Sequence, residues 1–126
     1  MYPVKWGDFM ATYQDKTKEE KIKYHISRIR GVFKTLDANK LKTVESLIKN
    51  AAFMAVTLEE LQEEINEKGI TEEYQNGANQ WGTKQSEAVK THIAMTRNHV
   101  SVMKTLADLA PPAPKGKSKL DELRGK

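Results

Sequence analysis

The sequence of 126 residues contains no cysteine and no long apolar run. Without cysteine, the chain can form neither a disulfide framework nor a thiolate metal site, and this composition suits a reducing compartment. No segment approaches the roughly 18 consecutive apolar residues of a membrane span, and the N-terminal part is too charged for the apolar core of a secretory signal. We therefore expect a cytoplasmic protein with no membrane partner.

Motifs of nucleotide-binding sites are also missing. The segment from Gly77 to Lys84, GANQWGTK, approaches the phosphate-binding pattern G-x-x-x-x-G-K-[ST], but its last two residues stand in the wrong order and no apolar strand precedes it. Nucleotide binding needs the lysine fixed at the start of a helix, with the hydroxyl next in line for the metal. The segment instead favours the geometry of a β-hairpin.

Histidines and carboxylates form no recognisable site either. His92 and His99 lie seven residues apart, whereas two helical ligands of one metal ion normally lie three or four apart. The glutamates between residues 59 and 67 have no base or nucleophile nearby in sequence, which favours a solvated or intersubunit face. We expect no enzyme, no cofactor and no metal.

The net charge of +4 hides a strong segregation along the chain. Residues 1–50 carry eleven Lys and Arg against six acids, residues 51–75 carry one against seven, and residues 76–126 carry nine against four. Two blocks of +5 therefore flank one of −6. Such segregation indicates a basic surface for a polyanion, with the acidic stretch kept away from it or facing the basic block of another subunit.

Apolar periodicity predicts two long helices in the first half of the chain. Thr17 and Glu20 have the capping-box spacing, and an apolar stripe then runs to about Leu36. Asp37 is a plausible cap for a second helix that continues to Gly69. That helix would measure roughly 45 Å, more than so small a globule covers alone, so we expect it to pack on another chain. The candidate oligomerisation positions are Ile48, Ala51, Ala52, Ala55, Leu58, Leu61 and Ile65.

A short β-hairpin and a third helix follow. Asn76-Gly77 is the strongest hairpin signal in the chain, because a type I′ turn needs positive φ at both central residues. Ser86 then caps a long helix that three prolines end. The hairpin residues are Tyr74, Asn76, Gly77, Trp81 and Gly82. The apolar positions of the helix are Val89, Ile93, Val100, Met103, Leu106 and Leu109.

The predicted fold class is mainly α, with three long helices and the hairpin between the second and the third. Residues 1–15 form an N-terminal arm, rich in aromatic side chains, that docks on the body or on a neighbour. Residues 16–110 form the helical domain for DNA binding and oligomerisation. Residues 111–126 form a flexible tail rich in proline and lysine. Such a polar tail buries too little apolar surface to offset the conformational entropy lost on ordering.

Basic residues gather on and beside the first helix. They flank its apolar stripe rather than interrupt it, so that one side of the helix can pack while the charges line another. This is the electrostatic footprint of phosphate binding, although an ordinary lysine-rich helix face is an equally good interpretation of the sequence. The candidate DNA-binding residues are Lys16, Lys18, Lys21, Lys23, Arg28, Arg30, Lys34, Lys40 and Lys42.

The order of features from the end of the second helix onward has a further implication. It consists of Gly69, then Tyr74-x-Asn76-Gly77, then Gly82 with Lys84, then Ser86 opening a helix that ends in Leu-Ala-Asp-Leu at 106–109. In this order, about the last half of the body resembles one lineage of phage terminase small subunits. The resemblance implies a DNA-packaging protein of the host cell cytoplasm that assembles into a homo-oligomeric ring and binds double-stranded viral DNA. It also implies recruitment and regulation of the terminase large subunit, which alone hydrolyses ATP and cuts DNA.

Two other functions are compatible with the same residues. The chain could be a dimeric DNA-binding regulator, in which the turn near Asp37 forms a helix-turn-helix. Alternatively, it could be a helical adaptor whose acidic and basic blocks pair between chains, with negligible affinity for DNA at physiological salt.

Overall fold

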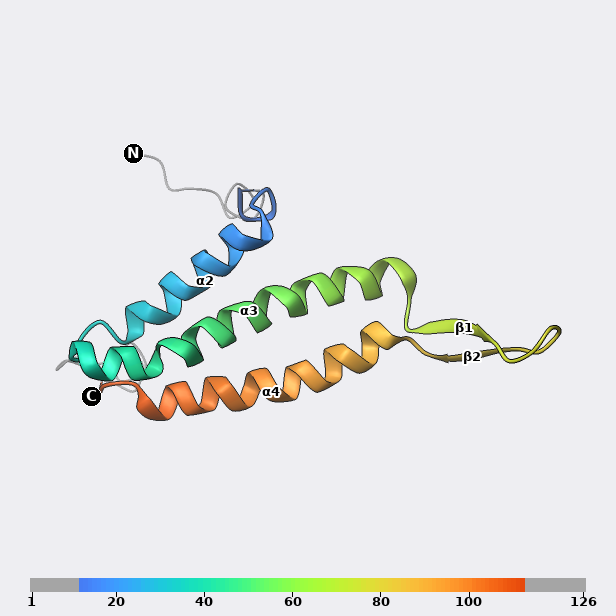
Figure 1. The fold of residues 1–126 in the computed structure, drawn as a ribbon. Coiled ribbons are helices and arrows are strands. Elements are labelled where there is room, and N and C mark those ends of the chain that lie inside the picture. Colours follow the sequence, from blue (N-terminus) through green and yellow to red (C-terminus); the bar gives the residue numbers. More distant parts are fainter. Residues whose placement is uncertain (1–11, 113–126) are drawn as a thin grey trace, which may run out of the picture.

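The computed structural model describes residues 12–112, and the predictions for residues 1–11 and 113–126 lie outside this range. The chain is mainly helical, with a two-stranded antiparallel hairpin between helices, which confirms the predicted fold class. Figure 1 shows the order of the elements and the hairpin projecting beyond the helices. The elements are α2 (Lys18–Val32), α3 (Ala38–Lys68), β1 (Thr71–Gln75), β2 (Trp81–Gln85) and α4 (Glu87–Leu109).

Helix α2 begins at the predicted capping box but ends earlier than expected. The Glu20 amide donates to the Thr17 hydroxyl at 3.2 Å, and the Glu20 carboxylate accepts from the Thr17 amide at 3.0 Å. The helix stops at Val32, not near Leu36, because the chain tightens into successive turns. In these turns the Phe33 amide donates to the Arg30 carbonyl at 2.9 Å. They carry the Phe33 side chain into the core.

Helix α3 has both of its predicted ends. The Asp37 carboxylate accepts from the Lys40 amide at 2.9 Å, which satisfies a free donor of the first turn. Gly69, with φ +87°, ends the helix in a conformation that residues with a side chain rarely adopt. At 31 residues α3 is roughly 46 Å long and is the longest of the described helices.

The hairpin is present, but its turn differs from the prediction. The strands pair from Thr71 with Gln85 to Gln75 with Trp81, which leaves a loop of residues 76–80. No residue other than glycine has positive φ within residues 12–112, so Asn76 does not take part in a type I′ turn. Instead, the Asn76 amide donates to the Gln80 carbonyl at 2.7 Å and closes a wider loop.

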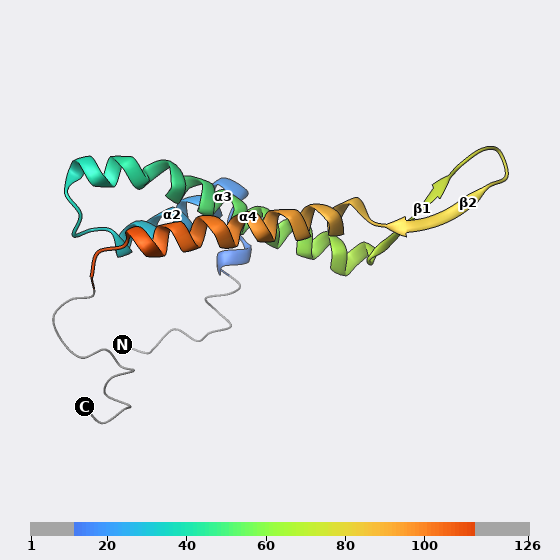
Figure 2. The same ribbon diagram turned by 90° about the horizontal axis from the view of Figure 1, so that it is seen from below.

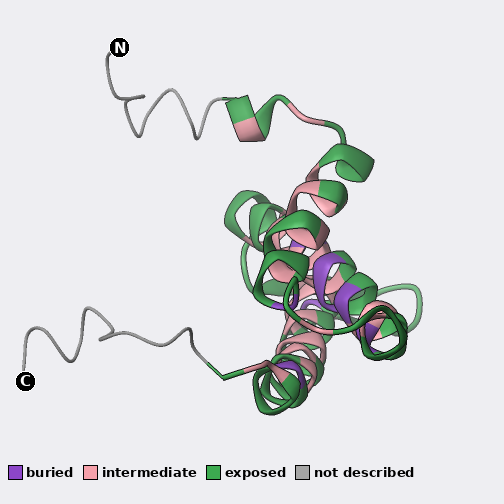
Figure 3. Cartoon of the chain, turned by 90° about the vertical axis from the view of Figure 1, so that its left-hand side faces the viewer, coloured by how far each residue is buried: buried purple, intermediate pink, exposed green. Residues whose placement is uncertain are grey.

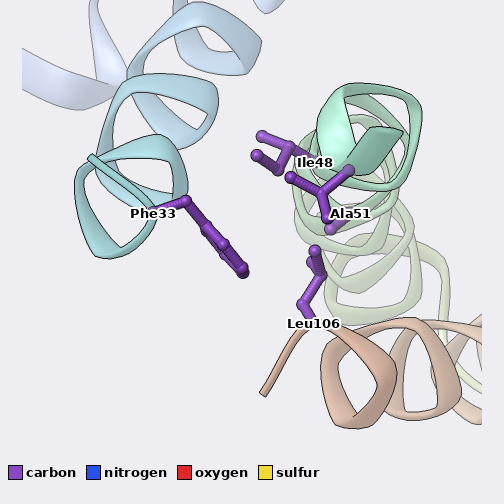
Figure 4. Close-up of a cluster of buried hydrophobic side chains, with 5 residues drawn as sticks. Phe33, Ile48, Ala51 and Leu106 are labelled. Carbon is purple, nitrogen blue, oxygen red and sulfur yellow. The ribbon is translucent and has the colours of Figure 1, made fainter. Parts of the chain in front are cut away.

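The core lies at the end of the molecule opposite the hairpin. Helix α3 packs against both α2 and α4, as Figures 1 and 3 show. Phe33 from the α2–α3 turn, Ile48 and Ala51 from α3 and Leu106 from α4 converge there (Figure 4). Ser86 caps α4 at its other end by accepting from the Val89 amide at 3.1 Å. The three helices are therefore fastened mainly near the α2–α3 turn.

Several large apolar side chains stay exposed outside this core. On α4, Ile93, Val100 and Met103 are 43%, 61% and 38% exposed, while Leu106 is buried. The hairpin projects into solvent (Figure 2), and its Trp81 is 66% exposed. Within residues 12–112, no helix is both long and apolar enough to cross a membrane.

Candidate nucleic-acid interface

Helices α2 and α3 lie antiparallel, and ion pairs join them at both ends of α2. Lys18 Nζ in the first turn lies 2.7 Å from Glu60 Oε1, and Arg30 in the last turn pairs with Glu45. The first contact reaches the C-terminal half of α3 and the second reaches its N-terminal part. A row of side chains along α2 therefore lies beside a row of side chains along α3.

One pair of stripes gathers basic side chains from both helices. On α2, Lys23 and Arg30 are seven residues apart, a spacing that places them on one face, and Lys34 follows in the turn after the helix. On α3, Lys42 and Lys49 lie three residues before and four residues after Glu45. Because Arg30 pairs with Glu45, the two stripes form one surface. We call these five residues, Lys23, Arg30, Lys34, Lys42 and Lys49, the basic face.

The charges of the basic face differ in their availability. Arg30 is neutralised by Glu45, and this pair holds the stripes together. Lys23, Lys34, Lys42 and Lys49 are exposed and have no ion-pair partner among residues 12–112. Lys49 was not among the residues predicted from the sequence, because it lies in α3 beyond the basic block. Lys49 is far from α2 in sequence, so the sequence alone does not indicate that the packing of α2 on α3 brings it to the basic face.

Other predicted DNA-binding residues lie elsewhere or are engaged. Lys18 pairs with Glu60, and its Nζ also lies 5.0 Å from the centre of the Phe53 ring. Lys21 Nζ lies 5.3 Å from the centre of the Tyr13 ring. Lys21 and Arg28 are seven residues apart and share a side of α2 distinct from that of Lys23.

The last two predicted residues are placed apart from the basic face in different ways. Lys16 is half-buried ahead of α2. Lys40 is exposed, but it lies two residues from Lys42, which turns its side chain by about 200° around α3. The nine predicted residues therefore do not form a single surface.

A polar cluster fastens the segment before α2 to the body. The Tyr13 hydroxyl lies 2.8 Å from His25 Nε2 and donates to the Glu59 carboxylate, whose oxygens are 2.8 and 2.9 Å away. Burial and the neighbouring Glu59 carboxylate raise the Tyr13 pKa well above its usual value. The end of the predicted arm is thus docked on α3, through residues too far apart in sequence for a motif to reveal.

The glycine-rich segment does not have the geometry of a phosphate-binding loop. Gly82 lies in β2 opposite Tyr74, and Lys84 lies 3.5 Å from Glu72 and 3.4 Å from Glu87. Hydrogen bonds to these two carboxylates raise the Lys84 pKa. The lysine is therefore engaged within the hairpin and at the start of α4.

The predicted oligomerisation residues divide into two groups. Ile48, Ala51 and Ala52 have no exposed surface, because α2 and α4 cover them. This corrects the expectation that their side chains contact a second chain. Ala55, Leu58, Leu61 and Ile65 are half-buried.

The histidines do not gather metal ligands. In residues 12–112, no three histidine or acidic side chains lie close enough together to hold a metal ion. His99 lines a groove with His25 and Arg28, and its pKa is lowered by burial and by the nearby His25.

Known proteins do not identify the chain. No family model, curated protein or solved structure matches it. The functional argument therefore depends on the chemistry of the surfaces. The basic face offers four exposed ammonium groups on α2, on α3 and in the turn between them, which suits the repeating phosphates of a nucleic acid.

Proposed function

We propose that this chain is the small subunit of a phage DNA-packaging terminase. In this role it assembles into a ring, binds double-stranded viral DNA, and recruits and regulates the large subunit. It leaves ATP hydrolysis and DNA cleavage to that subunit. Support comes from the short hairpin between two long helices, on which the resemblance depends, and from the basic face on α2 and α3.

The basic face is the observation that carries DNA binding. Its free lysines are ammonium groups on flexible stems, which contact phosphate oxygens and provide little discrimination between bases. Sequence preference would then come from the shape of DNA and from many copies binding at once. A ring provides many copies of the basic face that can bind one DNA duplex at once.

Assembly is supported by the balance of buried and exposed apolar side chains. Within residues 12–112, seven hydrophobic residues are buried, two of them alanines, whereas nine large ones are exposed. A core of this size provides modest stability, and exposed apolar surface indicates a protein interface.

The alternative of a dimeric helix-turn-helix regulator is less well supported. In that motif the two helices meet at a large angle and the second enters the major groove. Here the Lys18–Glu60 and Arg30–Glu45 pairs hold α2 alongside α3 over its whole length. The geometry favours a flat two-helix surface over a protruding recognition helix.

Salt dependence of DNA binding tests the proposed surface. The test variant replaces Lys34, Lys42 and Lys49 by Gln, and the control replaces Lys21, Lys40 and Lys84, which lie outside the basic face, by Gln and so removes the same charge. We expect the test variant to flatten the slope of log affinity against log salt by about three for each chain on the duplex, and the control to leave it nearly unchanged. Equal loss in both variants would show that only net charge matters.

Light scattering tests assembly separately. The wild-type chain of 14.3 kDa is expected to have a native mass of many multiples of this value at micromolar concentration. A monomer or a simple dimer under these conditions would contradict the ring, whatever the affinity for DNA.

A further inference from the structure

Helix α4 carries a mostly apolar stripe that the chain covers only in part. Val89 and Thr96 are half-buried and Met103 lines the groove beside α2, whereas Ile93, Val100 and Ala107 are exposed. The positions of the stripe alternate at intervals of four and three residues, the spacing of a coiled-coil seam. No position is charged, and β-branched Ile93 and Val100 lie seven residues apart. We call this stripe the outer seam: Val89, Ile93, Thr96, Val100, Met103 and Ala107.

The outer seam is distinct from the face that α4 packs on its own chain. Leu106 is buried and Val102 packs against the core, whereas Val100 is 61% exposed. Successive residues of a helix are 100° apart, so Val100 and Val102 point to clearly different sides. Covering the outer seam therefore requires another surface.

One edge of the outer seam is uniformly basic. Lys90, Arg97 and Lys104 recur every seven residues, and each immediately follows a seam position. Lys90 lies 3.6 Å from Glu87, but Arg97 and Lys104 have no ion-pair partner in the described part of the chain. A surface that covers the seam would be favoured by carboxylates at matching intervals.

Helix α3 presents such a surface at its C-terminal half. A shallow hollow there is lined by α3 residues alone, with Thr57 and Leu61 between the carboxylates. The Thr57 hydroxyl is buried and has no hydrogen-bond partner among residues 12–112. Glu60 and Glu67 have the same seven-residue interval as the basic edge. The acidic hollow comprises Thr57, Glu60, Leu61, Glu63, Glu64 and Glu67, with Lys68 at its end.

We infer that the outer seam of one copy docks on the acidic hollow of a second copy. Complementary charge selects this occupant: the seam has a basic edge and no acid, and the hollow has four glutamates and one lysine. Within one chain Glu60 pairs with Lys18 and Glu64 with Lys68, whereas Glu63 and Glu67 of the hollow and Arg97 and Lys104 of the seam edge have no ion-pair partner among residues 12–112. This inference rests on the assembly part of the proposed function and names the surfaces that perform it.

The contact is heterologous, since it joins two different surfaces. An open row of copies then leaves one seam free at one end and one hollow free at the other, and the row closes into a ring when the rotation between neighbours allows it. Most of the basic face lies nearer the α2–α3 turn: Arg30 is in the last turn of α2, Lys34 is in the connection, and Lys42 is near the start of α3. DNA binding and assembly therefore use different parts of the molecule.

Charge reversal and its rescue test the contact by light scattering. Arg97→Glu with Lys104→Glu, and separately Glu64→Lys with Glu67→Lys, are each expected to lower the native mass to that of the monomer. The chain that carries all four changes is expected to regain the wild-type mass, because the reversed edges again face opposite charges. Circular dichroism of each variant verifies that the helices are retained.

Disulfide trapping gives an independent readout, because the chain has no cysteine of its own. A Val100→Cys chain is mixed with a tagged Glu64→Cys chain under mild oxidation, and a disulfide between the two variants is expected. The matched control mixes Val100→Cys with tagged Thr83→Cys, whose cysteine lies on the exposed hairpin. This control is expected to form little cross-linked product.

The outcomes separate this inference from the proposed function. If the wild type assembles but both reversals assemble equally well, the docking surfaces are wrong while the ring proposal stands. If reversal at Arg97 and Lys104 weakens DNA binding without changing the mass, the outer seam is a nucleic-acid contact and the inference is overturned. A monomeric wild type would overturn both. Failure of the four-fold variant to reassemble would contradict the pairing of these two edges.

Discussion

Single side chains at the helix starts do much to fix where each element begins. Ser86 is buried, and its hydroxyl accepts from the Val89 amide at 3.1 Å. Its own amide donates to the Ile70 carbonyl at 2.9 Å, so that one residue joins the hairpin to α4. Asp37 has the corresponding role for α3. These caps were recognisable in the sequence, because a side-chain oxygen at the start of an apolar period has few other uses.

We predict that Ser86→Ala lowers the free energy of unfolding by about 1 kcal/mol, since it leaves the Val89 amide without its acceptor. Urea unfolding followed by circular dichroism measures the change. Ser86→Thr, which keeps a hydroxyl acceptor, is the control and is expected to lose clearly less. Equal losses in both variants would assign the effect to packing and not to the cap.

His99 makes the stability depend on pH. Burial, and then the electrostatic interaction with the neighbouring His25, lower its pKa below the ordinary value of 6.5. Arg28 also faces the groove, which has no carboxylate lining it. The folded chain therefore binds a proton here less readily than the unfolded chain, and stability falls as pH drops below 6.5 toward the folded pKa. Above 6.5 this penalty vanishes.

We accordingly expect His99→Gln to lose less stability on acidification than the wild type. Urea unfolding at one pH above 6.5 and at one pH well below it measures the difference between the two values. His92→Gln, on the same helix, is the matched control and is expected to behave like the wild type. An unchanged acid response in His99→Gln would contradict this role.

At the scale of elements, the sequence predicted helix starts and the hairpin better than turns and shared faces. Asp37 and Gly69 marked the ends of α3 because each has a local physical reason to be there. The turn after Val32 was not predicted, because it depends on burying Phe33 against α3 and α4. The hairpin loop departed from type I′ because Asn76 keeps a negative φ.

The candidate site shows the same division between local and long-range information. The sequence identified a basic block, but its nine residues proved to lie on several surfaces. Arg30 is neutralised by Glu45, fifteen residues away, and Lys49 joins the basic face only because α2 folds back along α3. Which charges share a face is decided by helix pairing, and no spacing within one helix contains that information.

The hairpin loop should depend on one glycine. Gly77 has φ +108°, where a residue with a Cβ is strained, so we expect Gly77→Ala to speed amide exchange in β1 and β2 while the helices keep their protection. Gly31→Ala is the matched control, since Gly31 lies in α2 with open space around it. That change is expected to stabilise the chain by up to about 1 kcal/mol. Unchanged exchange in the strands of Gly77→Ala would show that the loop tolerates alanine.

At the scale of the whole molecule, the chain is long and fastened mainly at one end. The core residues Phe33, Ile48 and Leu106 lie near the α2–α3 turn, whereas the hairpin end has mostly half-buried and exposed side chains. Such a body gains stability from any contact that covers α4 and the C-terminal half of α3. Folding and assembly should therefore be linked.

This linkage predicts that the thermal unfolding midpoint of the wild type rises with protein concentration, because association removes folded monomer from the unfolding equilibrium. Calorimetry across a hundredfold range of concentration measures the dependence. The chain with Arg97→Glu and Lys104→Glu should unfold at a midpoint independent of concentration. Ser86→Ala separates the two effects, since it should lower the midpoint and keep the dependence. A wild-type midpoint that does not move with concentration would mean that the exposed seam of α4 contributes nothing to the stability of the fold.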